Sequence, residues 1–124
     1  MPDDEIRLTI PARHEYARIA RVGVAALALR LGFDYSEVEE LRLAVDEALI
    51  LLLRTDRPGD RVTVRYQAGP GELAFRAVAQ CEEPPGPPAE EALGRFATLV
   101  GDLVDEWSVA DDGTWVELAK HHAD

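Results

Sequence analysis

The chain has 124 residues, 47% of them apolar and 30% charged, and its 24 acidic and 13 basic residues give a net charge of −11. This length suits one domain, and this composition is that of a globular protein rather than a disordered or fibrous one. The negative field repels a phosphate backbone, so we expect no nucleic-acid binding. The single cysteine, Cys81, excludes an intrachain disulfide and a cysteine-based zinc site.

The sequence shows no targeting or membrane-spanning segment. Residues 1–5 are acidic, whereas a signal peptide would be basic and then apolar. No apolar run is longer than that from Ala48 to Leu53, which is far shorter than the roughly 20 residues that cross a bilayer. We therefore expect a cytoplasmic protein that makes no contact with a membrane.

The first half of the chain is expected to form one strand and two helices. Apolar and polar residues alternate over residues 6–10, which predicts a half-buried strand. Apolar residues at helical spacing predict a helix over residues 13–31. Ser36 and Glu39 have the spacing of a capping box, which predicts the start of a second helix that runs to about Arg54.

A hairpin, a loop and a third helix are expected next. Alternating apolar residues over 62–66 and 73–79 flank a Gly-Pro-Gly turn and predict two paired strands. Residues 82–88 contain four prolines and one glycine, which favours a surface loop. Residues 89–105 repeat apolar side chains at helical spacing and predict the third helix.

The end of the chain predicts a second hairpin, over residues 107–110 and 114–118, because Asp112-Gly113 favours a tight turn. Residues 120–124 are expected to be a flexible tail. The order of elements predicts an α+β fold, a two-layer sandwich with a mostly antiparallel mixed sheet and three helices on one face. Residues 1–124 would form a single domain, and one of its two open sheet edges could serve a homodimer.

Three segments resemble a known family. Residues 41–51 resemble the first motif of the GHKL, or Bergerat-fold, ATPases, in the branch of RsbW-like anti-sigma factors with serine kinase activity. Residues 21–26 resemble the family's early Arg-x-x-Val segment, and residues 104–106 followed by residues 112–118 resemble its closing strand pair. The resemblance covers about Ile6 to Lys120 and implies a histidine-kinase-like ATPase fold.

The resemblance also implies a nucleotide site, from which this chain departs at its first motif. In the family this motif ends Glu-x-x-x-Asn, where the carboxylate acts on the nucleophile and the asparagine holds magnesium. Glu47 matches the carboxylate, but Leu51 stands at the asparagine position. Magnesium requires oxygen ligands, and leucine offers none.

The other nucleotide motifs are also reduced. The family's Asp-x-Gly-x-Gly segment corresponds to a proline-rich loop that lacks this Asp and has prolines in place of the glycines. Glu82 could replace the Asp only if the strand end shifts, and Gly86 is the one glycine of the loop. The glycine-rich lid is reduced to Gly94, and Thr114 takes a further nucleotide-site position. We therefore expect no productive ATP site and no cofactor, with Glu47 a helix carboxylate rather than a working base.

The first helix carries a small basic spot. Arg18 and Arg21 lie about 60° apart around a helix and off its buried stripe. The resemblance implies that the arginine matching Arg21 contacts a sigma factor and its competing antagonist, and guanidinium groups suit acidic partners. A solvated helix face without a partner is the alternative. The tail residues His121, His122 and Asp124 are adjacent in sequence and seldom make a preformed metal site, so we predict none.

Taken together, the resemblance implies a bacterial regulator of transcription. It would bind a sigma factor, an anti-anti-sigma antagonist, or both, in a partner-switching circuit of the stress-response kind, with its nucleotide site lost. One alternative is an active serine protein kinase that uses ATP, Mg²⁺ and Glu47 as base to phosphorylate the antagonist. Another is an unrelated small α+β module that binds some other protein. Leu51 and the proline loop argue against the kinase.

Overall fold

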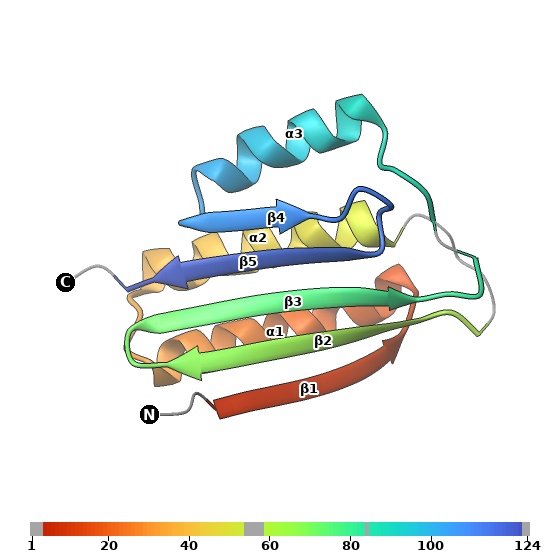
Figure 1. Cartoon of the computed structure of the whole chain (residues 1–124). Helices are drawn as coiled ribbons and strands as arrows, with labels where there is room; N and C mark the ends of the chain where they lie inside the picture. The colour runs from red at the N-terminus through yellow and green to blue at the C-terminus, as the bar shows by residue number, and fades with distance from the viewer. Residues whose placement is uncertain (1–3, 54–58, 84, 123–124) are drawn as a thin grey trace.

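Eight elements make up the fold in the computed structural model, which describes residues 4–53, 59–83 and 85–122 (Figure 1). They are β1 (Asp4–Pro11), α1 (His14–Arg30), α2 (Tyr35–Leu52), β2 (Arg61–Gly69), β3 (Glu72–Gln80), α3 (Glu90–Gly101), β4 (Glu106–Val109) and β5 (Trp115–His121). Every predicted strand and helix is present, with shifts at several ends.

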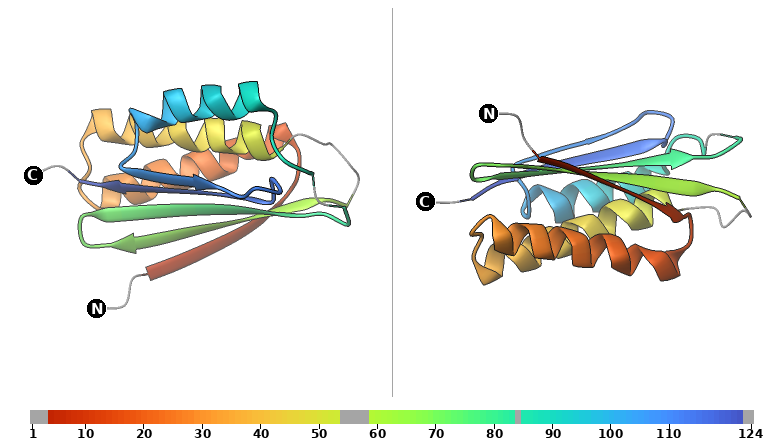
Figure 2. Two further views of the ribbon diagram at one scale, coloured as in Figure 1. Left: turned by 45° about the horizontal axis from the view of Figure 1, so that its top comes forward. Right: turned by 90° about the horizontal axis from the view of Figure 1, so that it is seen from below.

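The strands form one sheet in the order β1-β2-β3-β5-β4, and each of its pairings is antiparallel. The three helices lie on one face of this sheet, while the opposite face stays open (Figure 2). The predicted α+β two-layer fold is thus confirmed, except that the sheet is antiparallel throughout rather than mixed. Among the described helices, none combines the length and apolar character of a membrane span.

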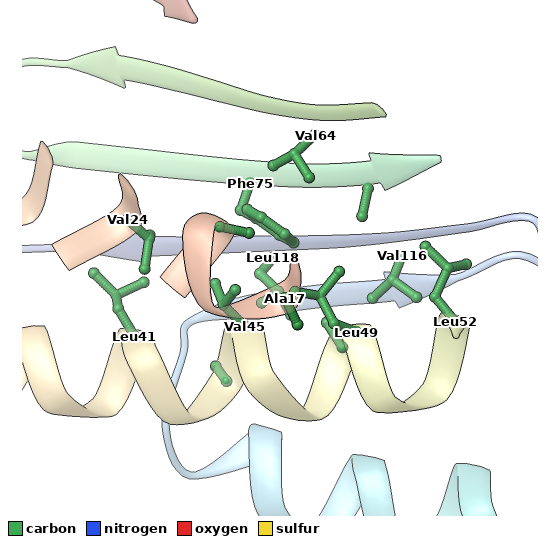
Figure 3. Packing of buried hydrophobic residues seen from close by; sticks show 14 of the residues in the cluster. Ala17, Val24, Leu41, Val45, Leu49, Leu52, Val64, Phe75, Val116 and Leu118 are labelled. Carbon is green, nitrogen blue, oxygen red and sulfur yellow. The ribbon is translucent and has the colours of Figure 1, made fainter. Parts of the chain in front are cut away.

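The core fills the space between the sheet and α2, the central helix. Figure 3 shows Leu41, Val45, Leu49 and Leu52 of α2 directed at the strands. Alternate strand residues face them, because successive side chains of a strand point to opposite faces. These residues are buried: Val62, Val64, Tyr66, Leu73, Phe75, Ala77, Val116 and Leu118. The period-two pattern of the sequence therefore identified the core face correctly.

The second helix begins two residues earlier than predicted, with Asp34 as its N-cap. An oxygen of Asp34 accepts from the Glu37 backbone N–H at 2.8 Å, and Glu37 Oε1 accepts from the Asp34 N–H at 2.9 Å. The predicted Ser36 and Glu39 box is therefore wrong. The choice follows from the flanking residues: Asp34 places the buried side chains of Phe33 and Val38 before and after the cap, as in a hydrophobic staple. The predicted end at Arg54 lies outside the described residues.

The third helix ends at Gly101, four residues before the predicted end. The backbone N–H groups of Leu103 and Val104 both donate to Val100 O, at 2.9 and 3.1 Å, in a tight turn. This turn leads directly into β4. Val104 lies beyond the helix but is buried. Its apolar side chain therefore extended the helical pattern in the sequence, which is why the predicted helix was too long.

The flexible tail predicted from Lys120 is wrong for residues 120–122. β5 runs to His121, and the Lys120 ammonium donates to Leu103 O at 2.7 Å. His122 stacks on Phe33, and its Nδ1 lies 2.7 Å from Glu37 Oε1, so the strand end is tied to the capping box of α2. Asp124 lies outside the described residues. Within those residues, no three His, Cys, Asp or Glu side chains gather as a metal site would require.

Gly23 allows α1 to approach the sheet closely. A Cβ at this position would lie 2.7 Å from Tyr66 Oη, which donates to Ala20 O at 2.8 Å. The burial of Tyr66 also raises the pKa of its phenol, so the group remains a neutral donor.

We expect Gly23→Ala to lower the free energy of unfolding by about 1 to 3 kcal/mol, because the added methyl group overpacks this contact. Urea denaturation measures the change. Gly94→Ala is the matched control, since Gly94 lies within α3 with open space around it and alanine favours a helix by about 1 kcal/mol. Equal effects of the two substitutions would contradict a steric role for Gly23.

Candidate functional site

Two neighbouring carboxylates on α2 connect the three helices. Asp46 Oδ1 lies 3.3 Å from Arg21 Nη1 on α1, and Glu47 Oε1 lies 3.2 Å from Arg95 Nη2 on α3. Successive residues of a helix point about 100° apart, so the two side chains reach opposite neighbours. One ion pair therefore links α2 to α1, and the other links α2 to α3.

Glu47, at the predicted position of the base, is mostly buried and engaged by Arg95. Sequence reasoning singled out Gly94 and missed the arginine next to it. Gly94 itself is exposed in the middle of α3, with a helical backbone and no glycine-rich loop around it. The available signal was a cation next to the only glycine of the expected lid, on a predicted helix.

Leu51 follows Glu47 by one helical turn and points into the core. Its side chain is 6% exposed and belongs to the main hydrophobic cluster, as do the neighbouring Ala48 and Leu52. The leucine therefore has a packing role of its own at the position where the family carries asparagine.

The remaining predicted nucleotide positions lie around the ends of β3 and β5. Glu82 is exposed in the loop after β3, and Gly86 has a positive φ of 85° in the same loop. Thr114 precedes β5, where its N–H and hydroxyl both donate to Asp112 Oδ1, at 3.1 and 2.6 Å. Thr114 O accepts from the Ala79 N–H at 2.7 Å, which brings this turn beside the loop. The bonds from Thr114 also lower the pKa of the Asp112 carboxyl.

The two predicted partner-binding arginines differ in their surroundings. Arg18 is exposed, and none of the ion pairs among the described residues involves it. Arg21 is half-buried against Asp46, and its Nε is buried without a hydrogen-bond partner in the described part of the chain. Arg18 is thus the free cation of the predicted spot, whereas Arg21 also links α1 to α2.

The outer face of α1 carries an apolar stripe that sequence reasoning missed. Ile19, Val22 and Leu29 are 47%, 57% and 62% exposed. At 100° per residue these three positions lie within about 80° of one another, with Arg18 at the edge of the stripe. We call Arg18, Ile19, Val22 and Leu29 the α1 surface. Their spacing was visible in the sequence but was overlooked beside the more regular buried stripe.

Comparison with known proteins establishes the family. The family model described as the histidine kinase-like ATPase domain matches residues 10–120. The chain belongs to the histidine kinase-like ATPase domain family. This match excludes the alternative of an unrelated α+β module.

Relatives of this histidine kinase-like ATPase domain include serine-protein kinases named RsbW. The protein from Listeria innocua is 33% identical over 76 residues, covering 59% of this chain and 48% of that protein. The protein from Oceanobacillus iheyensis is 41% identical over 46 residues, covering 37% of this chain and 29% of that protein. The chain therefore spans less than half the length of these curated relatives.

A solved structure has the same fold. The RsbU and RsbW domains of Rv1364c from Mycobacterium tuberculosis match 96% of this chain and 32% of theirs, with a TM-score of 0.64 and 17% sequence identity. The domain thus has the RsbW-like GHKL fold that its motifs resemble.

An ATPase family implies a binding site for a magnesium-bound nucleotide. The described residues of this histidine kinase-like ATPase domain do not suit such a ligand. Leu51 offers no oxygen, and a hydrated dication beside its apolar neighbours would lose solvation without compensation. Arg95 engages the Glu47 carboxylate, and the turn before β5 uses the Thr114 hydroxyl.

Proposed function

We propose that the chain is a regulator of the anti-sigma type, which binds a sigma factor, an anti-anti-sigma antagonist, or both, in a partner-switching circuit. The observation that carries this proposal is the α1 surface, where apolar side chains and Arg18 are exposed together. Contiguous exposed apolar side chains are typical of protein-binding surfaces. The similarity to RsbW serine-protein kinases supports this class of partner.

The charge of the chain gives the α1 surface its selectivity. A net charge of −11 repels acidic partners in general. An acidic segment therefore binds favourably only where the attraction of nearby cations exceeds this repulsion. Arg18 provides such a cation, and a forked guanidinium group suits carboxylates. Arg21 lies on the same helix, but its charge is paired with Asp46. We expect the protein to act in the cytoplasm and to leave nucleic acids unbound.

We further propose that the nucleotide site is not productive. Loss of one charge-assisted hydrogen bond costs about 1.5 to 3 kcal/mol, or roughly one to two decades in affinity, and this chain departs from the family at several such positions. A regulator of this kind would bind its partners without phosphorylating them.

Thermal unfolding with and without Mg-ATP tests this proposal. We expect millimolar Mg-ATP to leave the melting temperature unchanged, since a ligand stabilises only when its concentration approaches Kd. An RsbW kinase measured under the same conditions is the positive control. A rise of several degrees would contradict the proposal.

The retained Glu47 favours one other candidate, an active serine kinase that phosphorylates the antagonist. Incubation of the chain with labelled ATP and the purified antagonist distinguishes the two functions. We expect no transfer of label, either from the parent or from a Glu47→Gln variant. Transfer that is lost in Glu47→Gln would establish the kinase.

A further inference from the structure

The open face of the sheet, opposite the three helices, carries arginines on three adjacent strands (Figure 2). Arg7 of β1, Arg65 of β2 and Arg76 of β3 are direct partners in the strand register, so their side chains leave the sheet side by side. Like charges directly across an antiparallel pair destabilise it. The row therefore needs negative groups close to it.

Two of these arginines have a carboxylate partner, and the central one has none. Arg7 Nε lies 3.2 Å from Glu5 Oε2, and Arg76 Nη1 pairs with Glu117 Oε1. Within the described part of the chain, no carboxylate pairs with Arg65, and its Nε is buried without a hydrogen-bond partner. Buried polar groups in proteins are normally paired with protein, water or another ligand. The Arg65 guanidinium is therefore available to an anionic group.

Arg65 and Arg76 line one end of a hollow of about 450 Å³ on this open face. Ala74 and Ala119 also line it, and they are direct partners on β3 and β5. Because alanine side chains are short, they form a low apolar floor between the longer side chains around them. Small-molecule sites have volumes of about 300 to 1,000 Å³, so the hollow is large enough for a small ligand.

The far side of the hollow is acidic. Glu72 lies four residues before Arg76 on β3, about 13 Å along the strand, and Glu106 on β4 is the partner of Ala119. Both carboxylates approach His121, Glu72 at 4.0 Å from its Nδ1 and Glu106 at 3.5 Å from its Nε2. Histidine is a full cation only when it is protonated, so these carboxylates can accept a cationic group of a ligand.

We propose that the hollow binds a small zwitterion, with its carboxylate at Arg65 and its ammonium group at Glu72 and Glu106. A short aliphatic chain between the two charges would lie over the alanine floor. Forked guanidinium groups suit carboxylates, and a zwitterion without net charge escapes the repulsion of a chain with a charge of −11. This inference does not rest on the proposed function, because it uses neither α1 nor the nucleotide positions.

Titration of the chain with ε-aminocaproate, followed by the amide NMR spectrum, tests the proposal. We expect saturable shifts concentrated at Gln67, Ala74 and Ala119, which line the hollow. Caproate lacks the ammonium group and hexylamine lacks the carboxylate. Each should bind at least about tenfold more weakly than ε-aminocaproate, because each loses one charge-assisted contact.

Substitutions at the two ends of the hollow separate the two contacts. Arg65→Gln should weaken binding of ε-aminocaproate at least about tenfold, whereas Arg61→Gln should leave it nearly unchanged. Arg61 is the matched control, since it is an exposed arginine on the same face of β2 outside the hollow. Glu72→Gln combined with Glu106→Gln should weaken binding of ε-aminocaproate and leave caproate binding no weaker.

The melting temperature distinguishes lost binding from lost folding. Arg65→Gln removes one of three adjacent like charges, so we expect the variant to melt no earlier than the parent.

Three results would overturn the proposal: no saturable shifts at millimolar probe concentrations, equal binding of the three probes, or equal weakening by Arg65→Gln and Arg61→Gln. A dilution series without any probe is the remaining control. If the same amides shift on dilution, a second copy of the chain covers this face, which would also overturn the proposal. Binding of a sigma factor or antagonist through α1 is measured separately, so either proposal can fail alone.

Discussion

Leu51→Asn is expected to lower the free energy of unfolding by about 3 kcal/mol, measured by urea denaturation. The substitution removes a core side chain that is 6% exposed, and comparable losses of buried leucine cost about 2 to 5 kcal/mol. It also places an amide among apolar neighbours that offer no hydrogen bond, which adds to the cost. The residue that matches the family motif should thus harm this particular fold.

Two substitutions serve as controls. Leu51→Met keeps the volume and apolar character of the side chain, so we expect a loss below about 1.5 kcal/mol. Ile50→Asn introduces the same amide one position earlier, where the side chain is 42% exposed, and should cost less than half as much as Leu51→Asn. If Leu51→Asn proved harmless and gained stability from Mg-ATP, the nucleotide site would be latent rather than lost.

The elements were predictable because their patterns are local. Each strand and helix buries one face, and this burial sets the spacing of its apolar residues. The alternation over β2 and β3 and the helical spacing of α1 can therefore be recognised from a few consecutive residues. The start of α2 was harder, since two candidate capping boxes lie two residues apart. Only the burial of Phe33 and Val38 decides between them, and burial is a property of the whole fold.

The contacts that define the site join distant parts of the chain. Arg95 and Glu47 are 48 positions apart, and His122 and Glu37 are 85 apart. Contacts over such distances leave no periodic pattern in the sequence. The sequence alone therefore could not show that Arg95 pairs with Glu47, or that His122 pairs with Glu37. The family resemblance singled out Glu47 and Leu51, but their neighbours required the structure.

Arg18→Glu is expected to weaken binding of the cognate sigma factor or antagonist by at least about 2 kcal/mol, measured by isothermal titration calorimetry. The variant replaces an exposed cation beside Val22 and Leu29 with a charge that repels an acidic partner. Arg61→Glu is the matched control, because it makes the same change in net charge at an exposed position on β2. Equal losses in both variants would mean that overall charge, and not the α1 surface, governs binding.

Arg21→Glu should weaken binding by a similar amount, but it also sets a glutamate against Asp46 and strains the contact between α1 and α2. The exchange Arg21→Glu with Asp46→Arg separates these effects, since it restores an ion pair and leaves position 21 acidic. If Arg21 contacts the partner, the exchanged chain should recover its melting temperature and still bind weakly. Recovery of both properties would make Arg21 a structural link between the helices, and Arg18 with the apolar stripe would then carry the interaction.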